Sequence, residues 1–175
     1  RFLLIYGGVT VVAVVLAVYL APALDTLLPL LLALPLLLVQ TAYDVRNQSR
    51  AAAAELAGAL ATGALASVIV LMAGWSWTTA WTLWLALAIK AATAVLYVRS
   101  RLRLERGRSA GVALAVGTHV LGLAILIGMV LAGWLPWTVP VAMALLTIRA
   151  GVGLSPLRKP RPPKVIGFQE MAYGL

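Results

Sequence analysis

The sequence predicts an all-α protein, a polytopic transmembrane helical bundle with six spans and the start of a seventh. Composition is the first reason: hydrophobic residues make up 63% of the 175 residues and charged residues 11%, with a mean hydropathy of +1.01. A soluble domain is usually about half apolar and about one quarter charged. A soluble chain this apolar would expose large hydrophobic patches, so we expect an integral membrane protein.

The second reason is the alternation of long apolar runs with short polar connections. A helix needs roughly 20 apolar residues to cross the ~30 Å hydrocarbon core of a bilayer. We expect one domain, 1–175, with spans at about 2–24, 26–43, 55–74, 78–98, 110–133 and 136–150, and a truncated seventh at 166–175. Because the chain starts at Arg1 without Met and stops inside an apolar run, we expect both ends of a longer protein to be missing.

The connections also alternate in charge, which predicts their orientation. One set is basic and the other carries almost no charge, and all six Trp residues lie near the uncharged set. Lys and Arg favour the cytoplasmic side, and Trp favours the membrane interface. We therefore expect a bacterial cytoplasmic (inner) membrane protein, with the basic loops and the start of the chain cytoplasmic and the Trp-rich loops on the opposite side.

Several classes of site are excluded by composition. The chain has no Cys and one His, which rules out disulfides, thiolate metal sites and a multi-histidine haem or zinc site within it. Although the net charge is +9, every Lys and Arg except Lys90 lies at or beyond the end of an apolar run, so we expect no nucleic acid. We also expect no cofactor held by this chain.

The joint QTAYDVRNQSR, at residues 40–50, is a first candidate ligand site. Gln40, Asp44 and Gln48 follow one another at four-residue steps, which places them on one helical face. They line a cytoplasm-facing cleft in one interpretation; in the other, Asp44 sits at a solvated helix end and pairs with Arg46 or other nearby bases. A single carboxylate is a poor magnesium site, and Glu170 would have to supply the second one.

Two ionisable residues fall within apolar runs. Lys90 lies roughly 12 Å inside the boundary at Val98, by the 1.5 Å rise of a helix, and is either functional or snorkels to the interface. The available acids for it are Asp44, Glu55 and Glu170. His119 lies near mid-bilayer, where it either hydrogen-bonds across helices, for example to Thr118 or a nearby Ser, or takes part in proton transfer or a quinone contact.

Two further patterns point to contacts. The five arginines between Arg99 and Arg108 form a loop that suits anionic lipid headgroups, at about 1 kcal/mol per residue, or else an anionic substrate or the acidic surface of a membrane protein partner. Glu55, Ala59, Gly63 and Ser67 form a mostly small-residue stripe, which predicts close helix packing.

The segments YDVRNQSR, ELAGALATG, LYVRSRLRLERG and LSPLRKPRPPKVIGFQEMAYGL resemble the YwiC-like family of bacterial membrane proteins. The similarity runs from about residue 30 to the end, and its most specific parts are the arginine-rich loop and the closing GFQE stretch. A Lys-Glu-His-Gly-Ala-Trp type motif of that family is absent. The resemblance implies a multispanning membrane protein and no particular activity.

A weaker resemblance links the chain to the UbiA superfamily of intramembrane prenyltransferases. Gln40 and Asp44 resemble its first Asn/Asp-rich motif, and Tyr97 and Arg101 resemble its Tyr-x-x-x-Lys motif. That family holds a prenyl diphosphate through magnesium on two Asp-rich motifs. Here the first motif keeps one acid and a basic stretch replaces the second.

Three functions remain open after this reading. The first is a non-catalytic accessory or scaffold subunit of a larger membrane complex, favoured by the lack of a complete catalytic constellation. The second is a prenyltransferase-like enzyme, with magnesium, or a protein that binds a prenyl lipid or quinone at a degenerate cytoplasmic site. The third is a small transporter, with Lys90 and His119 on its pathway. The candidate ligand-binding residues are Gln40, Asp44, Lys90, Tyr97, Arg101 and Glu170, with His119 as an intramembrane polar residue.

Overall fold

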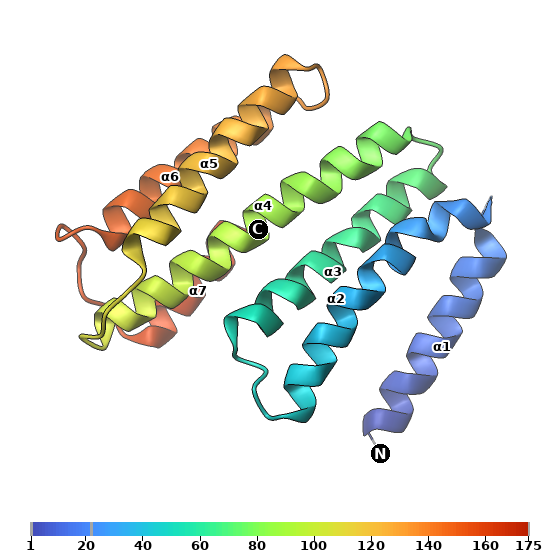
Figure 1. Cartoon of the computed structure of the whole chain (residues 1–175), viewed down its shortest axis with the longest axis horizontal. Helices are drawn as coiled ribbons and strands as arrows, with labels where there is room; N and C mark the ends of the chain where they lie inside the picture. Colours follow the sequence, from blue (N-terminus) through green and yellow to red (C-terminus); the bar gives the residue numbers. More distant parts are fainter. Residues whose placement is uncertain (1, 22, 175) are drawn as a thin grey trace.

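The computed structural model describes residues 2–21 and 23–174, and within them every regular element is a helix (Figure 1). The elements are α1 (Phe2–Leu20), the short 3-10 helix η1 (Leu24–Leu27), α2 (Leu28–Val45), α3 (Ala52–Met72), α4 (Trp77–Glu105), α5 (Val112–Leu131), α6 (Thr138–Leu154) and α7 (Pro163–Gly174). The predicted all-α class is confirmed.

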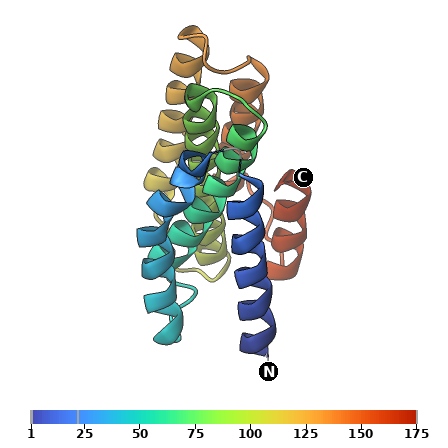
Figure 2. The same ribbon diagram turned by 90° about the vertical axis from the view of Figure 1, so that its right-hand side faces the viewer.

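The helices form a bundle centred on α4. Helix α3 packs between α2 and α4, while α5 and α6 pack on each other and both contact α4; α7 has its main contact with α4. Figure 2 shows α1 and α7 on the same side of the body that the other helices form. Helix α4 is therefore common to two halves of the molecule, one with α2 and α3 and one with α5, α6 and α7.

The predicted number of spans is wrong in detail. Within the described residues, four helical segments are long and apolar enough to cross a membrane: Leu24–Val45, Ala52–Met72, Trp77–Glu105 and Val112–Leu131. Helix α6, Thr138–Leu154, is a shorter apolar helix of 17 residues. Helix α7 covers most of the range in which the start of a seventh span was expected.

The arginine-rich segment is mainly helix, where the sequence reading expected a loop from Arg99. Arg and Leu are good helix formers, and Arg101 forms an i,i+4 ion pair of 2.8 Å with Glu105. The helix ends at Glu105, and Gly107 then adopts a left-handed φ of 63°, which glycine tolerates without strain. At 29 residues, α4 is about 44 Å long and extends beyond the ~30 Å thickness of a hydrocarbon core.

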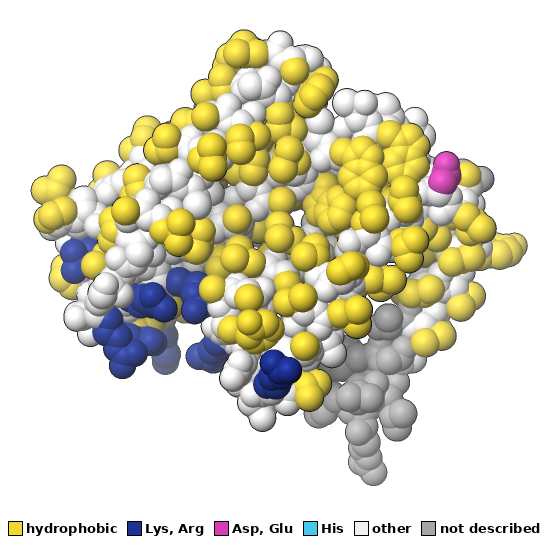
Figure 3. All heavy atoms as spheres, in the orientation of Figure 1, with side chains coloured by type: hydrophobic (Ala, Val, Ile, Leu, Met, Phe, Trp, Pro, Cys, Tyr) yellow, Lys and Arg dark blue, Asp and Glu magenta, His cyan; other side chains and the backbone are white. Residues whose placement is uncertain are grey.

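The predicted packing stripe of α3 is confirmed only in part. Of its four residues Ser67 is buried, while Glu55, Ala59 and Gly63 are half-buried, and the other buried small residues of α3 lie beside this stripe. Ala57, Ala61, Ala64 and Ser67 are all buried, and the Ser67 hydroxyl donates a hydrogen bond of 2.8 Å to the carbonyl of Ala80 in α4. The surface has the opposite character: Figure 3 shows hydrophobic side chains over most of the visible face, with Lys and Arg gathered at one end. An apolar exterior and a small-residue interior fit a helical membrane protein.

Candidate functional site

A large cavity lies between α4, α6, α7 and the α6–α7 linker. Its volume is about 1140 Å³, slightly above the range of about 300–1,000 Å³ typical of small-molecule pockets. Along α4 its lining runs from Leu83 to Arg101, a length of about 27 Å at 1.5 Å per residue. The cavity is thus long enough for an extended chain.

The lining of this cavity changes in polarity from one end to the other. Near the Trp-rich end of α4 it is apolar, with Leu83, Leu87, Leu126, Val139 and Leu146. Toward the opposite end it becomes cationic, through Arg101, Arg149, Arg158, Lys159 and Arg161. Glu170 is the acid in this lining, so positive charge is in excess at that end.

Arg101 connects the linker to α4. Its side chain is almost fully buried, and it donates hydrogen bonds to the carbonyl oxygens of Gly153 and, at 2.6 Å, Lys159. The same guanidinium forms the 2.8 Å ion pair with Glu105, whose carboxylate also lies 3.9 Å from Arg158. Because so many of its donors are engaged, we assign Arg101 a structural role at the cavity wall.

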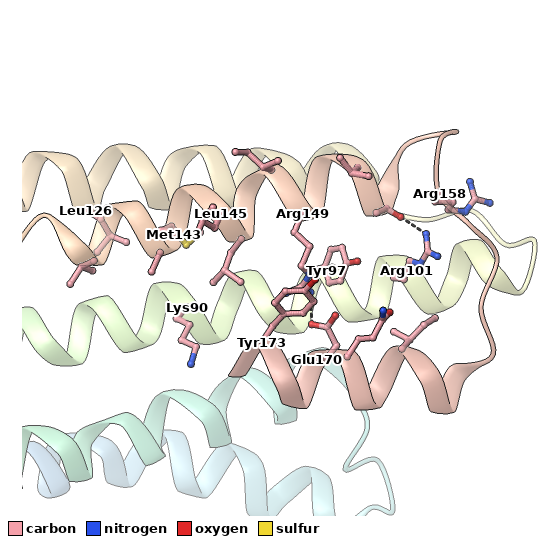
Figure 4. Close-up of a pocket in the computed structure, with 18 of the residues that line it drawn as sticks. Lys90, Tyr97, Arg101, Leu126, Met143, Leu145, Arg149, Arg158, Glu170 and Tyr173 are labelled. Atoms are coloured by element: carbon pink, nitrogen blue, oxygen red, sulfur yellow. Dashed lines mark hydrogen bonds and ion pairs between the residues drawn. The ribbon is translucent and has the colours of Figure 1, made fainter. Parts of the chain in front are cut away.

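Arg149 occupies the boundary between the apolar and cationic parts of the cavity. Its guanidinium carbon lies 4.3 Å from the centre of the Tyr97 ring and 4.5 Å from that of Tyr173. Arg149 also donates a hydrogen bond to the Glu170 carboxylate, with which it forms an ion pair. Figure 4 shows this side chain reaching from α6 toward Glu170 on α7, with the two tyrosines beside it. Three helices thus contribute to one Tyr–Arg–Tyr cluster.

Tyr97 also packs against His119 of α5 and Gly153 of α6. It is buried, and its ring meets that of His119 edge-on with 6.3 Å between the ring centres. Its hydroxyl lies directly against Gly153: a Cβ atom there would come within 2.3 Å of the hydroxyl oxygen. The close approach of α4 and α6 at this point therefore requires glycine.

Glu170 is an unusual carboxyl group because of its surroundings. Burial raises its pKa above the ordinary range, and the positive charge and hydrogen bond of Arg149 oppose that shift without cancelling it. The Arg149 ion pair therefore does not fully compensate the desolvation of Glu170.

The structure brings together four of the six candidate ligand-binding residues. Lys90, Tyr97, Arg101 and Glu170 all line the cavity. Gln40 and Asp44 do not: Gln40 packs against Gly58 in α3, where a Cβ atom would lie 2.6 Å from its side-chain oxygen. Asp44 is exposed at the end of α2.

The expected partnership between Glu170 and Asp44 is wrong. Helix α7 packs on α4, and Glu170 pairs with Arg149 instead. A second of the three acids expected near Lys90 also pairs with an arginine, since Glu55 forms a 3.0 Å ion pair with Arg99. Arginine can bind a carboxylate through several N–H groups in one plane, which favours it over lysine in such pairs.

His119 is buried, but its hydrogen bond differs from the expected one. Its Nδ1 lies 2.7 Å from the carbonyl oxygen of Ala115, one turn earlier in α5, so this hydrogen bond stays within its own helix, while its ring meets that of Tyr97 on α4. It does not line the large cavity. With Lys90 it borders a void of about 40 Å³, which Arg149 and Glu170 also line.

Sequence reasoning missed Arg149 as a site residue, because the sixth span was expected to end at residue 150. Helix α6 continues to Leu154, so Arg149 lies more than one turn inside it. The small residues that follow, in RAGVGL, were the available signal, since a Gly-rich turn after a charge permits close approach of another helix. Tyr173 and the linker cations Arg158, Lys159 and Arg161 were not singled out either.

Comparison with known proteins gives one match. A model of the YwiC-like protein family matches residues 1–70, so the predicted resemblance to this family is confirmed over α1, α2 and most of α3. The matched range ends before the arginine-rich segment and the closing stretch, on which the sequence reading relied most. No curated protein and no solved structure matches the chain, and the resemblance to the UbiA superfamily gains no support.

Proposed function

We propose that this YwiC-like chain is a multispanning membrane protein that binds an amphiphile with one apolar chain and a phosphate head group. The observation that carries the proposal is the change in polarity along the cavity between α4, α6 and α7. Its apolar part matches the chain of such a ligand and its cationic part matches the head group. Of the functions considered from the sequence, this cavity favours a protein that binds a prenyl lipid without catalysing a reaction on it.

The head group would provide most of the selectivity. Lipid tails are as apolar as Leu side chains, so moving a chain from the bilayer into the cavity changes its surroundings little. A phosphate, in contrast, gains hydrogen bonds from several cations at once. A neutral quinone or alcohol with the same chain would lack this gain.

Direct recognition by cations is a better match to the geometry than a magnesium-diphosphate site. A magnesium ion usually takes one or two carboxylates together with substrate oxygens. Glu170 already accepts a hydrogen bond from Arg149, and Asp44 is at the end of another helix. We therefore propose binding that does not require magnesium.

The other two functions have less in their favour. The described residues show no particular surface that favours a scaffold role. A transporter pathway would need Lys90 and His119 along one cavity between both faces, and in the described part of the chain the two residues meet at the small void.

The test is thermal unfolding of the purified protein in mild detergent with farnesyl phosphate, farnesol and a quinone, each with magnesium or EDTA. A ligand at a hundred times its dissociation constant stabilises the folded state by about 2.7 kcal/mol. We expect farnesyl phosphate to raise the melting temperature equally with and without magnesium, and farnesol to have little effect. An equal response to farnesol would contradict the proposal, and a magnesium-dependent response would favour the prenyltransferase-like reading.

We also propose that the basic end of the bundle faces the cytoplasm, by the positive-inside rule. The chain has no Cys, so single substitutions can report sidedness without background. Ser109→Cys and Thr78→Cys place an exposed thiol at the α4–α5 and α3–α4 ends respectively. In whole cells, a membrane-impermeant maleimide should label only the Thr78→Cys protein; labelling of the Ser109→Cys protein alone would reverse the orientation.

A further inference from the structure

Arg149 is the cation best placed to meet a head group after the chain has entered the apolar part of the cavity. The residues before it on α6 that line the cavity are mostly apolar, such as Met143 and Leu146, and the linker cations follow it. It is only partly exposed, with 19% of its side-chain surface accessible. A charge in such surroundings interacts more strongly with an anion than a charge in bulk water does.

The two tyrosines restrict where this guanidinium can lie. Tyr97 and Tyr173 are within 4.5 Å of its carbon atom, well inside the ~6 Å limit for cation–π attraction. Aromatic contacts of this kind use the faces of the guanidinium, while its N–H donors lie in its plane. The two tyrosine rings therefore restrict the orientation of the Arg149 guanidinium.

Glu170 uses one part of that donor set. Its carboxylate accepts a hydrogen bond from one terminal nitrogen of Arg149, whereas a guanidinium has five N–H donors. A phosphate has three acceptor oxygens and a charge of about −1.5 to −2 at pH 7, so it can accept more of these hydrogen bonds than one carboxylate oxygen does. A phosphate therefore has an electrostatic advantage over Glu170 at this position.

Helix α7 is joined to α6 by few interactions. Its main helix contact is with α4, while its connection to α6 includes the Arg149–Glu170 ion pair and the Arg149–Tyr173 contact. Loss of one ion pair thus removes much of what joins α7 to α6.

We infer that Arg149 recognises the ligand's phosphate, that Tyr97 and Tyr173 position it, and that Glu170 is an internal anion which competes with that phosphate. This inference rests on the proposed function and assigns roles within the same site. Glu170 would then set the selectivity of the cavity, because a weak anion cannot displace it and a phosphate can. Lys90, which lines both the cavity and the small void, and His119, which lines the void alone, are not given a direct role.

The test is equilibrium binding of farnesyl phosphate to full-length protein in nanodiscs of neutral lipid, at constant pH and salt. Glu170→Gln keeps the shape of the side chain and removes the competing charge, so we expect binding about tenfold tighter, the difference between a charged and a neutral hydrogen-bonding partner. Arg149→Lys keeps the charge but loses the planar donor set, and binding should weaken about tenfold. Arg149→Ala should weaken it about a hundredfold.

Arg103→Ala is the matched control. Arg103 is an exposed arginine near the C-terminal end of α4, and it is not part of the cavity lining. This variant should bind like the wild type. If wild type prefers farnesyl phosphate to farnesol but Arg149→Lys and Arg149→Ala bind like Arg103→Ala, the inference fails and the proposed function stands. If wild type binds neither ligand, the proposed function itself fails.

The role of Glu170 has its own contradicting outcome. If Glu170→Gln weakens binding to the level of Arg149→Ala, then Glu170 positions Arg149 and does not compete with the ligand. Tyr173→Leu tests the aromatic contact apart from the charge of Glu170. It removes one aromatic face and should weaken binding several-fold. Adding Glu170→Gln to this variant should still make binding tighter, as it does in the wild type. If Glu170→Gln no longer tightened binding in the Tyr173→Leu protein, the aromatic contact and the competition by Glu170 would not be independent.

Discussion

The two halves of the bundle on either side of α4 are held together by different interactions. On the side of α2 and α3, small residues allow close packing: Gly58 meets Gln40, and Gly63 meets Trp84, whose indole N–H donates a hydrogen bond of 2.8 Å to the carbonyl of Leu60. On the side of α6 and α7, the Arg149–Glu170 ion pair and the hydrogen bond from Arg101 to Lys159 join elements around a cavity of about 1140 Å³.

The difference shows where this molecule can change shape and where it cannot. Close packing of Ala and Gly leaves no space, so any movement would cost many contacts at once. Ion pairs across a cavity are few and can exchange one partner for another of the same charge. A site that admits a ligand is therefore expected in the second half, and the following predictions test this contrast, from the largest effect to the smallest.

Removal of Arg101 should have the largest effect on stability. Arg101→Ala leaves the buried Glu105 carboxylate without its 2.8 Å partner and frees the carbonyls of Gly153 and Lys159. Breaking a buried pair on one side typically costs about 3–5 kcal/mol. Denaturant unfolding in mixed micelles measures the loss, and Arg103→Ala is the exposed control on the same helix. Equal stability of the two variants would show that Arg101 does not hold the linker.

Overpacking the other half should be the next largest effect. Ala64 in α3 is fully buried against α2 and α4, and Ala64→Leu inserts a larger side chain where there is no space. We expect a loss of about 1–3 kcal/mol, measured in the same unfolding assay. Leu65, one residue on, is exposed, so Leu65→Ala should cost much less. A stable Ala64→Leu protein would mean that this half is as loosely packed as the cavity half.

The partly exposed Glu55–Arg99 ion pair should contribute little. Its side chains are 37% and 27% accessible, and surface ion pairs are typically worth about 0.2–1 kcal/mol. Glu55→Gln should therefore lower stability by less than about 1 kcal/mol, with a smaller difference at high salt. A loss as large as that of Arg101→Ala would show that solvent does not screen this pair.

Asp44→Ala should have the smallest effect. Asp44 is exposed at the C-terminal end of α2, where a negative charge is unfavourable next to the helix dipole. We expect unchanged membrane insertion and folding, and a stability change within about 0.5 kcal/mol. Membrane fractionation and unfolding of the purified variant measure both. A protein that fails to insert would identify Asp44 as a structural residue.

The elements of the fold could be predicted because they depend on local chemistry. Runs of apolar residues form helices in lipid since each backbone N–H and C=O must be satisfied within its own segment, and such runs are visible in the sequence. The ends were less accurate: α4 extends to Glu105 and α6 to Leu154. The extension of α4 carries Arg, and that of α6 lies just after Arg149; hydropathy reads Arg as a boundary although it is a good helix former.

The candidate site could be predicted only in part. Lys90, Tyr97, Arg101 and Glu170 stood out because polar groups within or beside apolar runs are costly and need partners. Their partners could not be predicted from the sequence, because Glu170 is far in sequence from Tyr97 and Arg149 contacts both from a third helix. No short-range pattern encodes such a meeting of three helices.

The sequence by itself therefore determined the class of molecule, the apolar helices, the alternation of basic and Trp-rich connections and the small-residue character of α3. All of these follow from the partition of side chains between lipid, interface and water, residue by residue. Only the tertiary structure decided that Arg149 lies between Tyr97 and Tyr173, that Arg101 holds the linker, and that a cavity remains beneath α7. These depend on how whole helices pack, which is a sum of many weak contacts between residues distant in the chain.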